Sequence, residues 1–167
     1  ALSINSAEKI LGAGAFYNFI TKKLNSENYT EEIFNYFFLL DEAYNLKIDN
    51  LFDFAKRVMS DFDYKGYKLG IIYGIDGDYQ SIIADKILFD KKLDYEVVAF
   101  LNVHGTVSFR SKNNIDVSDI AKKLGMIVGY SGGGHKHASG CRICDRDEMK
   151  KKMMEIFEHS MNKIKIL

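Results

Sequence analysis

The spacing of short apolar segments after residue 64 constrains the fold of this chain more than any other feature. Residues 69–75 form a β-branched apolar run bounded by Gly and Asp, which is typical of a buried strand. Residues 95–101 and 106–111 have the same character, and the four residues between them are few enough for a hairpin turn. Three apolar strands so close together predict a sheet whose faces must be covered by other elements.

Helical segments alternate with these strands. Residues 79–91 place their isoleucines on one helical face, and Asp116 is expected to cap a second helix that Gly125 ends. A last strand is predicted over residues 140–144, followed by a closing helix that Asp145 caps. The alternating C-terminal tail would add an edge strand or pack loosely. This order of elements predicts an α/β fold with a central mixed β-sheet flanked by helices.

The beginning of the chain has a different character. Residues 1–63 carry apolar residues at helical spacing and are predicted to form a helical connector or subdomain that precedes the sheet. Helices are expected to begin at Ser6, at Thr30 and near Asp49. Residues 64–167 are predicted to form the second, sheet-containing domain.

Composition indicates a folded protein and excludes several functional classes. The chain has 167 residues, of which 47% are apolar, and equal numbers of basic and acidic residues, 23 each. A formal charge of zero argues against binding duplex nucleic acid through bulk electrostatics. Because no apolar run reaches the length of a membrane span and no charged-then-apolar leader opens the chain, we expect a cytoplasmic protein without membrane contact.

The clearest candidate for a ligand site is the stretch at residues 131–140, Ser-Gly-Gly-Gly-His-Lys-His-Ala-Ser-Gly. Three consecutive glycines let the backbone take positive φ and approach a ligand closely, as binding loops do. His135, Lys136 and His137 add donors within about one helical turn. A helix that began at His135 would direct its first N–H groups and its dipole toward a phosphate. The alternative is a flexible surface turn followed by solvated basic residues.

Several motifs together resemble the DHH-associated domain. They are Ser-Phe-Arg-Ser at residues 108–111, the helix start at 115–121, and Gly-Gly-Gly-His-Lys-His-Ala-Ser-Gly at 132–140, and the resemblance covers roughly residues 70–145. That domain forms the C-terminal half of many DHH phosphoesterases, including oligoribonuclease/phosphatase types, single-strand DNA exonucleases and exopolyphosphatase-like proteins. The resemblance therefore implies a substrate-binding domain.

In the family, the arginine matching Arg110 and the glycine loop matching residues 132–135 face the catalytic domain across a cleft. They hold the phosphate and sugar of the substrate's nucleotide. A guanidinium at a strand end offers a bidentate fork for phosphate, and bare amides offer further donors. Taken alone, Arg110 could instead pair with an acid such as Asp116. The expected substrate-binding residues are Arg110, Ser111, Gly132, Gly133, Gly134, His135 and Lys136.

The catalytic half of such an enzyme is not expected in this chain. The resemblance implies two divalent metals, manganese or magnesium, held by Asp and His residues that include an Asp-His-His triplet, and the sequence contains no such triplet. Asp76-Gly77-Asp78 is interpreted as a turn, because no adjacent segment supplies further metal ligands. We expect no catalytic residue, metal ligand or cofactor in this chain, and no activity without an N-terminal catalytic domain of the same protein.

Two other interpretations stay open. The chain could be a stand-alone, non-catalytic module that binds a nucleotide or RNA, or a domain whose glycine loop packs on another subunit. The expected ligand is a phosphate-containing small molecule or a short single-stranded nucleic acid. The apolar first helices would favour a homodimer if a partner domain left them uncovered.

Overall fold

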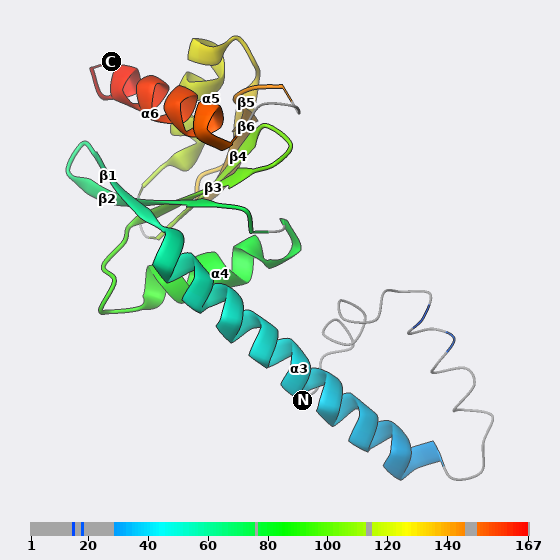
Figure 1. Ribbon diagram of the computed structural model, residues 1–167. Coiled ribbons are helices and arrows are strands. Elements are labelled where there is room, and N and C mark those ends of the chain that lie inside the picture. Colours follow the sequence, from blue (N-terminus) through cyan, green and yellow to red (C-terminus); the bar gives the residue numbers. More distant parts are fainter. Residues whose placement is uncertain are drawn as a thin grey trace. The chain divides into compact units, whose positions relative to one another are not determined.

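The computed structural model of the protein describes residues 15, 18, 29–75, 77–112, 115–145 and 150–166 (Figure 1). Contacts divide the chain into two units, Ala1–Asn50 and Leu51–Leu167, and all strands lie in the second unit. None of the described helices combines the length with the apolar character that a membrane span requires.

Helix α3, Tyr29–Val58, runs without a break through the segment where the sequence predicts two helices. Residues 41–48 contain no Gly or Pro and several good helix formers, so nothing in them ends the first helix. The side chain of Asn45 donates to Asp41 Oδ2, one turn earlier, at 3.3 Å. The two predicted helices are therefore one. The helix predicted from Ser6 falls almost wholly outside the described residues.

Six strands form one mixed sheet in the order β1-β2-β3-β4-β6-β5. Strands β2 and β3 are parallel and the other neighbouring pairs are antiparallel, which confirms the predicted α/β fold. The strands are β1 Ser60–Tyr64, β2 Tyr67–Tyr73, β3 Val97–Asn102, β4 Thr106–Ser111, β5 Gly132–His135 and β6 Ala138–Arg142. The helices that follow α3 are α4 Gly77–Phe89, α5 Val117–Val128 and α6 Lys150–Ile166.

Helices α5 and α6 cover one face of the sheet (Figure 1). The core on this face combines alternate strand residues with the apolar stripes of both helices. Its largest side chains include Phe109 and Phe157, whose ring centroids are 6.1 Å apart. Met161 and Ile164 are fully buried in the same core. The C-terminal tail therefore continues α6 to Ile166 and does not add an edge strand.

Helix α4 lies on the other face, where it contacts β3 and the neighbouring β4 (Figure 1). The buried residues on this side include Ile72 and Phe100 of the strands and Ile83 and Ile87 of α4. None of them belongs to the core cluster under α5 and α6. The sheet thus separates two sets of apolar contacts.

Strand β1 is not predicted by the sequence analysis, and it lies across the boundary placed between residues 63 and 64. Two of its five residues are the exposed Asp61 and Asp63, and aspartate is uncommon in strands. The turn to β2 has φ of 53° at Lys65 and 86° at Gly66. Positive φ at both positions is the geometry that suits a two-residue hairpin.

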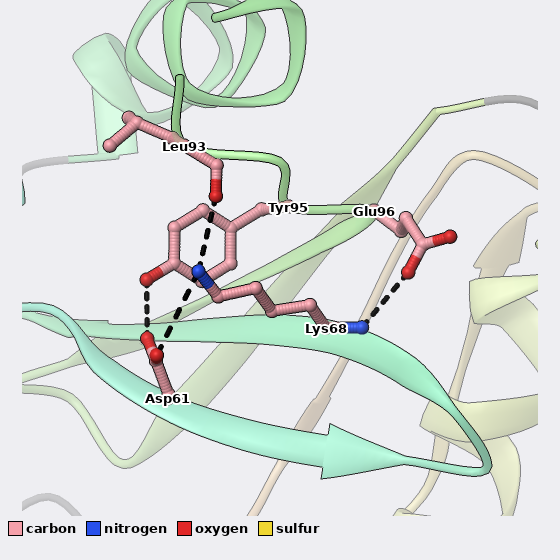
Figure 2. Close-up of polar contacts among 5 residues, drawn as sticks. All are labelled: Asp61, Lys68, Leu93, Tyr95 and Glu96. Atoms are coloured by element: carbon pink, nitrogen blue, oxygen red, sulfur yellow. Dashed lines mark hydrogen bonds and ion pairs between the residues drawn. The ribbon is translucent and has the colours of Figure 1, made fainter. Parts of the chain in front are cut away.

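Polar contacts hold the segment before β3 against this hairpin (Figure 2). The Tyr95 hydroxyl donates to Asp61 Oδ1. Lys68 Nζ donates to the Leu93 carbonyl at 3.1 Å and lies 4.1 Å from the centroid of the Tyr95 ring, while the Lys68 backbone N–H donates to Glu96 Oε2 at 2.9 Å. Burial, followed by the bond to Asp61, raises the pKa of Tyr95 well above its usual value.

Helix α5 does not end at Gly125, as predicted, but continues to Val128 and is capped by Gly129, whose φ is 80°. Gly125 is buried in the helix, where an added Cβ would lie 2.9 Å from a backbone nitrogen of β5. Glycine is therefore needed here for close packing between helix and strand. The cap predicted at Asp145 depends on residues 146–149, which lie outside the described ones.

Candidate functional site

Within Leu51–Leu167, helices α5 and α6 lie on one face of the sheet, and α4 lies on the other face, where it contacts β3 and β4. Burial alternates along β4, so that Val107, Phe109 and Ser111 are buried on the α5 and α6 side and the residues between them are half-buried. Strand registers place the matching residues of β6 and β5 on the same side. We call this surface the open face; it consists of Thr106, Ser108, Arg110, Gly133, His135, Ala138, Gly140 and Arg142.

The structure brings Arg110 and His135 together on the open face. Both residues pair in register with Ala138, which lies between them on β6. Since neighbouring strands are about 4.8 Å apart, their Cα atoms are separated by about 10 Å. The methyl group of Ala138 leaves the space between the two longer side chains open to a ligand.

The floor beside this row is also made of small residues. Ser108 pairs with Gly140, which pairs with Gly133. A Cβ on Gly140 would lie 2.6 Å from the Val107 carbonyl oxygen, and Gly133 has φ of 154°, a conformation that side chains rarely adopt. Larger side chains do not fit at Gly140 and Gly133. The sheet surface is therefore bare at these positions, and a ligand can approach the strands closely.

Arg110 does not pair with Asp116, the alternative raised by the sequence. Asp116 caps α5 instead: its Oδ1 accepts from the Ser118 backbone N–H at 2.9 Å and from the Ser118 hydroxyl at 2.6 Å. These bonds lower the pKa of Asp116. In the part of the chain that the structure describes, Arg110 has no carboxylate at ion-pair distance. A half-buried guanidinium without an acid is well suited to an anionic ligand.

The glycine run forms strand β5 at the edge of the sheet, and no helix begins at His135. The helix considered at His135 does not form, because residues 132–135 are a strand. A Cβ on Gly132 would collide with the Ala121 carbonyl oxygen of α5 and lie 2.7 Å from the Cys141 Cβ. Gly134, with φ of 143°, would place a Cβ 2.7 Å from the Ala138 carbonyl oxygen. Strand packing thus explains these glycines, whereas Gly133 lies on the open face.

Ser111 and Lys136 do not share the open face with Arg110. Ser111 is buried on the opposite side, where its hydroxyl donates to the Ile115 carbonyl at 2.9 Å and lies 3.3 Å from His137 Nδ1. Lys136 is exposed in the two-residue turn between β5 and β6. The carbonyl of Lys136 accepts from the Val117 N–H at 2.8 Å, so the turn is held at the start of α5.

Sequence reasoning missed three polar residues of the open face, namely Thr106, Ser108 and Arg142. The signal was present in the strand at 106–111, because residues at positions i and i+2 share a face. That rule joins Ser108 to Arg110 and separates Ser111 from both. Arg142 could not be found in this way, since its position opposite Thr106 depends on how β4 pairs with β6.

No three His, Cys, Asp or Glu side chains gather closely enough to hold a metal ion within the residues that the structure describes. Of the predicted turn at Asp76-Gly77-Asp78, Asp76 lies outside those residues and the other two begin α4. Cys141 and Cys144 are buried in the core under α5 and α6, and no disulfide joins them. Burial raises the pKa of the Cys141 thiol to about 12.

Comparisons with known proteins agree with this architecture. The model of the DHHA1 domain family matches residues 66–163, from the turn before β2 to the last turns of α6. No curated protein matches the chain.

Solved structures share its fold at low sequence identity. An uncharacterized protein from Helicobacter pylori is 22% identical with a TM-score of 0.58, over 84% of this chain and 43% of that one. RecJ from Thermus thermophilus, in complex with Mg²⁺, is 16% identical with a TM-score of 0.59, over 98% of this chain and 24% of RecJ. The DHH domain of a member of a ribosomal protein family is 17% identical with a TM-score of 0.54, over 81% of this chain and 35% of that one. The chain spans less than half of each of these structures.

Proposed function

Because this chain belongs to the DHHA1 domain family, we propose that it is the substrate-binding portion of a DHH-family, metal-dependent phosphoesterase. Its substrates would be nucleotides, short oligonucleotides or related phosphate esters. Manganese or magnesium would be bound by an N-terminal catalytic domain of the same protein, which would also supply the nucleophilic water. RecJ, which shares the fold, was crystallised with Mg²⁺ and is about four times as long as the segment that this chain matches.

The observation that carries the proposal is the row formed by Arg110, Ala138 and His135. It presents a guanidinium without an acidic partner among the described residues and an imidazole on one face, with a methyl group between them. A guanidinium can bind two phosphate oxygens at once, and an imidazole N–H can bind a third. The row would hold the phosphate still while charge develops on it in the transition state.

Binding of a 5′-phosphorylated dinucleotide to the purified chain tests the proposal. We expect Arg110→Gln to weaken binding about 10- to 100-fold, since a charge-assisted hydrogen bond contributes about 1.5–3 kcal/mol. His135→Ala should weaken it about tenfold. Isothermal titration calorimetry measures both affinities, and NMR shift changes locate the ligand.

Arg57→Gln is the matched control, because Arg57 is an exposed arginine at the end of α3 and is not part of the open face. It should leave the affinity unchanged. Equal losses from Arg57→Gln and Arg110→Gln would mean that net charge, and not the row, accounts for binding. The proposal also fails if the unmodified chain binds no phosphate ester.

A further inference from the structure

A hollow of about 450 Å³ lies at the end of the sheet, next to the open face. Gly74 and Gly77 line it from the segment after β2, and Asn102, His104 and Thr106 line it from the hairpin between β3 and β4. Its volume is in the range of small-molecule sites. Thr106 belongs to both the hollow and the open face, so the two surfaces are continuous.

Side-chain hydrogen bonds fix the orientation of the amide groups at the polar edge of the hollow, and with it which groups can donate to a ligand. Gln80, which is 5% exposed, donates through Nε2 to the Ile75 carbonyl at 2.9 Å and to Asn102 Oδ1 at 2.5 Å. A carbonyl can only accept, so this contact fixes the orientation of the Gln80 amide. Asn102 must then turn its Nδ2 toward Thr106 Oγ1, at 3.1 Å. The Thr106 hydroxyl accepts that bond and keeps its own proton to donate to a ligand.

The residues that line the hollow would accommodate a ligand with a planar ring. A Cβ added at Gly74 or at Gly77 would meet nothing within 4 Å, so open space adjoins the bare backbone at both positions. Val103 is 53% exposed and His104 is exposed beside it. An imidazole provides a planar surface on which a base can stack. A planar ligand with hydrogen-bond acceptors on its edge fits this combination, and nucleobases have that form.

We propose that the hollow is a nucleobase subsite, in which the Thr106 hydroxyl and the Asn102 amide donate to an acceptor edge of the base. This inference rests on the proposed function and narrows it to ligands that carry a base, as opposed to bare phosphate chains. Thr106 and Arg110 are four residues apart on β4, which is about 13 Å. The base in the hollow therefore belongs to a nucleotide beyond the one whose phosphate Arg110 binds, and the ligand is at least a dinucleotide.

Arg142 supplies a further contact for such a ligand. It pairs in register with Thr106 and is exposed on the open face. In the proposed complex its guanidinium would bind the phosphate that joins the two nucleotides. The basic groups thus occur at both ends of the open face, with the small residues of the floor between them.

Two variants test the subsite without altering the Arg110 row. Thr106→Val removes the hydroxyl and keeps the branched shape, and Gly77→Phe places a large side chain at an exposed residue that lines the hollow and has space around it. We expect Thr106→Val to weaken binding of a 5′-phosphorylated dinucleotide about 3- to 10-fold, the loss of one hydrogen bond. Gly77→Phe should weaken it more. Neither variant should change the affinity for tripolyphosphate, measured by calorimetry on the full chain.

The outcomes separate this inference from the proposed function. The affinities for the dinucleotide and for tripolyphosphate could both depend on Arg110 while neither changes in Thr106→Val or Gly77→Phe. In that case the base subsite is wrong and the phosphate site stands. If none of the probes binds the unmodified chain, both proposals fail. NMR spectra confirm that each variant is folded, and dinucleotide-induced shifts at Gly74, Gly77 and His104 are expected only if a base enters the hollow.

Discussion

At the scale of single residues, the polar side chains of this domain divide into those with internal partners and those facing outward. Asp116, Gln80 and Tyr95 each make a hydrogen bond that holds two elements together or caps one. Arg110 makes no such bond or ion pair with the described residues, although it is half-buried. Keeping a charge partly desolvated is unfavourable unless something binds it. A substitution of Arg110 is therefore the first test of ligand binding, and a substitution of Tyr95 is the first test of folding stability.

The raised pKa of Tyr95 predicts how stability depends on alkaline pH. Below the unfolded value of about 10 both states keep the phenolic proton, and the contribution of the hydrogen bond to Asp61 is fully present. As the pH rises above that value the unfolded chain loses its proton first, so the free energy of unfolding falls. We expect Tyr95→Phe to cost about 1 kcal/mol at neutral pH and to remove part of the alkaline decline.

Urea unfolding at a series of pH values measures this dependence, and ultraviolet absorbance follows tyrosinate formation. Tyr67→Phe is the control, because Tyr67 is 40% exposed. If the alkaline decline is the same in both variants, the Tyr95 hydroxyl does not contribute to it.

At the scale of elements, the position of the open face depends on how closely α5 lies against β5. Gly125 of the helix and Gly132 of the strand lack side chains where the two backbones meet. This contact holds the edge strand beside β6, which keeps His135 in register with Arg110 and Gly133 in register with Ser108. The glycines that look like a binding loop in the sequence therefore act mainly through packing.

Gly132→Ala should destabilise the domain by about 1–3 kcal/mol, because the added methyl group would meet the backbone of α5 and β5 would have to move. Gly77→Ala is the control, since its methyl group would meet no other atom within 4 Å, and a change within about 0.5 kcal/mol is expected. The midpoint of urea unfolding measures both. Equal stability of the two variants would show that the contact between α5 and β5 tolerates an extra carbon.

Sequence patterns predict the elements that bury a continuous apolar run and miss those that depend on neighbours. Strands β3 and β4 and the cap at Asp116 follow from local composition, and all three are observed. Strand β1 carries exposed aspartates, so its sequence lacks the apolar pattern that would have predicted a strand. Arg110 and His135 could both be named, but their common row requires β6 to lie between them, and strand order is a tertiary property.

At the scale of the whole molecule, the two faces of the sheet are covered unequally. Helices α5 and α6 cover one face, while α4 lies against β3 and β4 on the other. The basic residues Arg110 and Arg142 lie on the face opposite α5 and α6. The chain spans 43% of the Helicobacter pylori protein and 24% of RecJ, so the matched structures contain more than this domain.

From this arrangement we expect the purified chain to bind a 5′-phosphorylated dinucleotide but not to hydrolyse it. Adding manganese should produce no phosphate or mononucleotide above a protein-free blank, because the sequence lacks the Asp-His-His ligands. Chromatography of the products measures this directly. Turnover that a chelator abolishes would contradict the assignment of catalysis to another domain.

The separation of the two apolar cores by a single sheet has a consequence for how such a domain can diverge. Substitutions at exposed positions of α4 and the adjoining hairpin would alter the proposed ligand surface, while the side chains that keep α5 and α6 in place are untouched. If the proposed surface binds the substrate, its preference for one substrate over another can change through substitutions that leave the core under α5 and α6 intact.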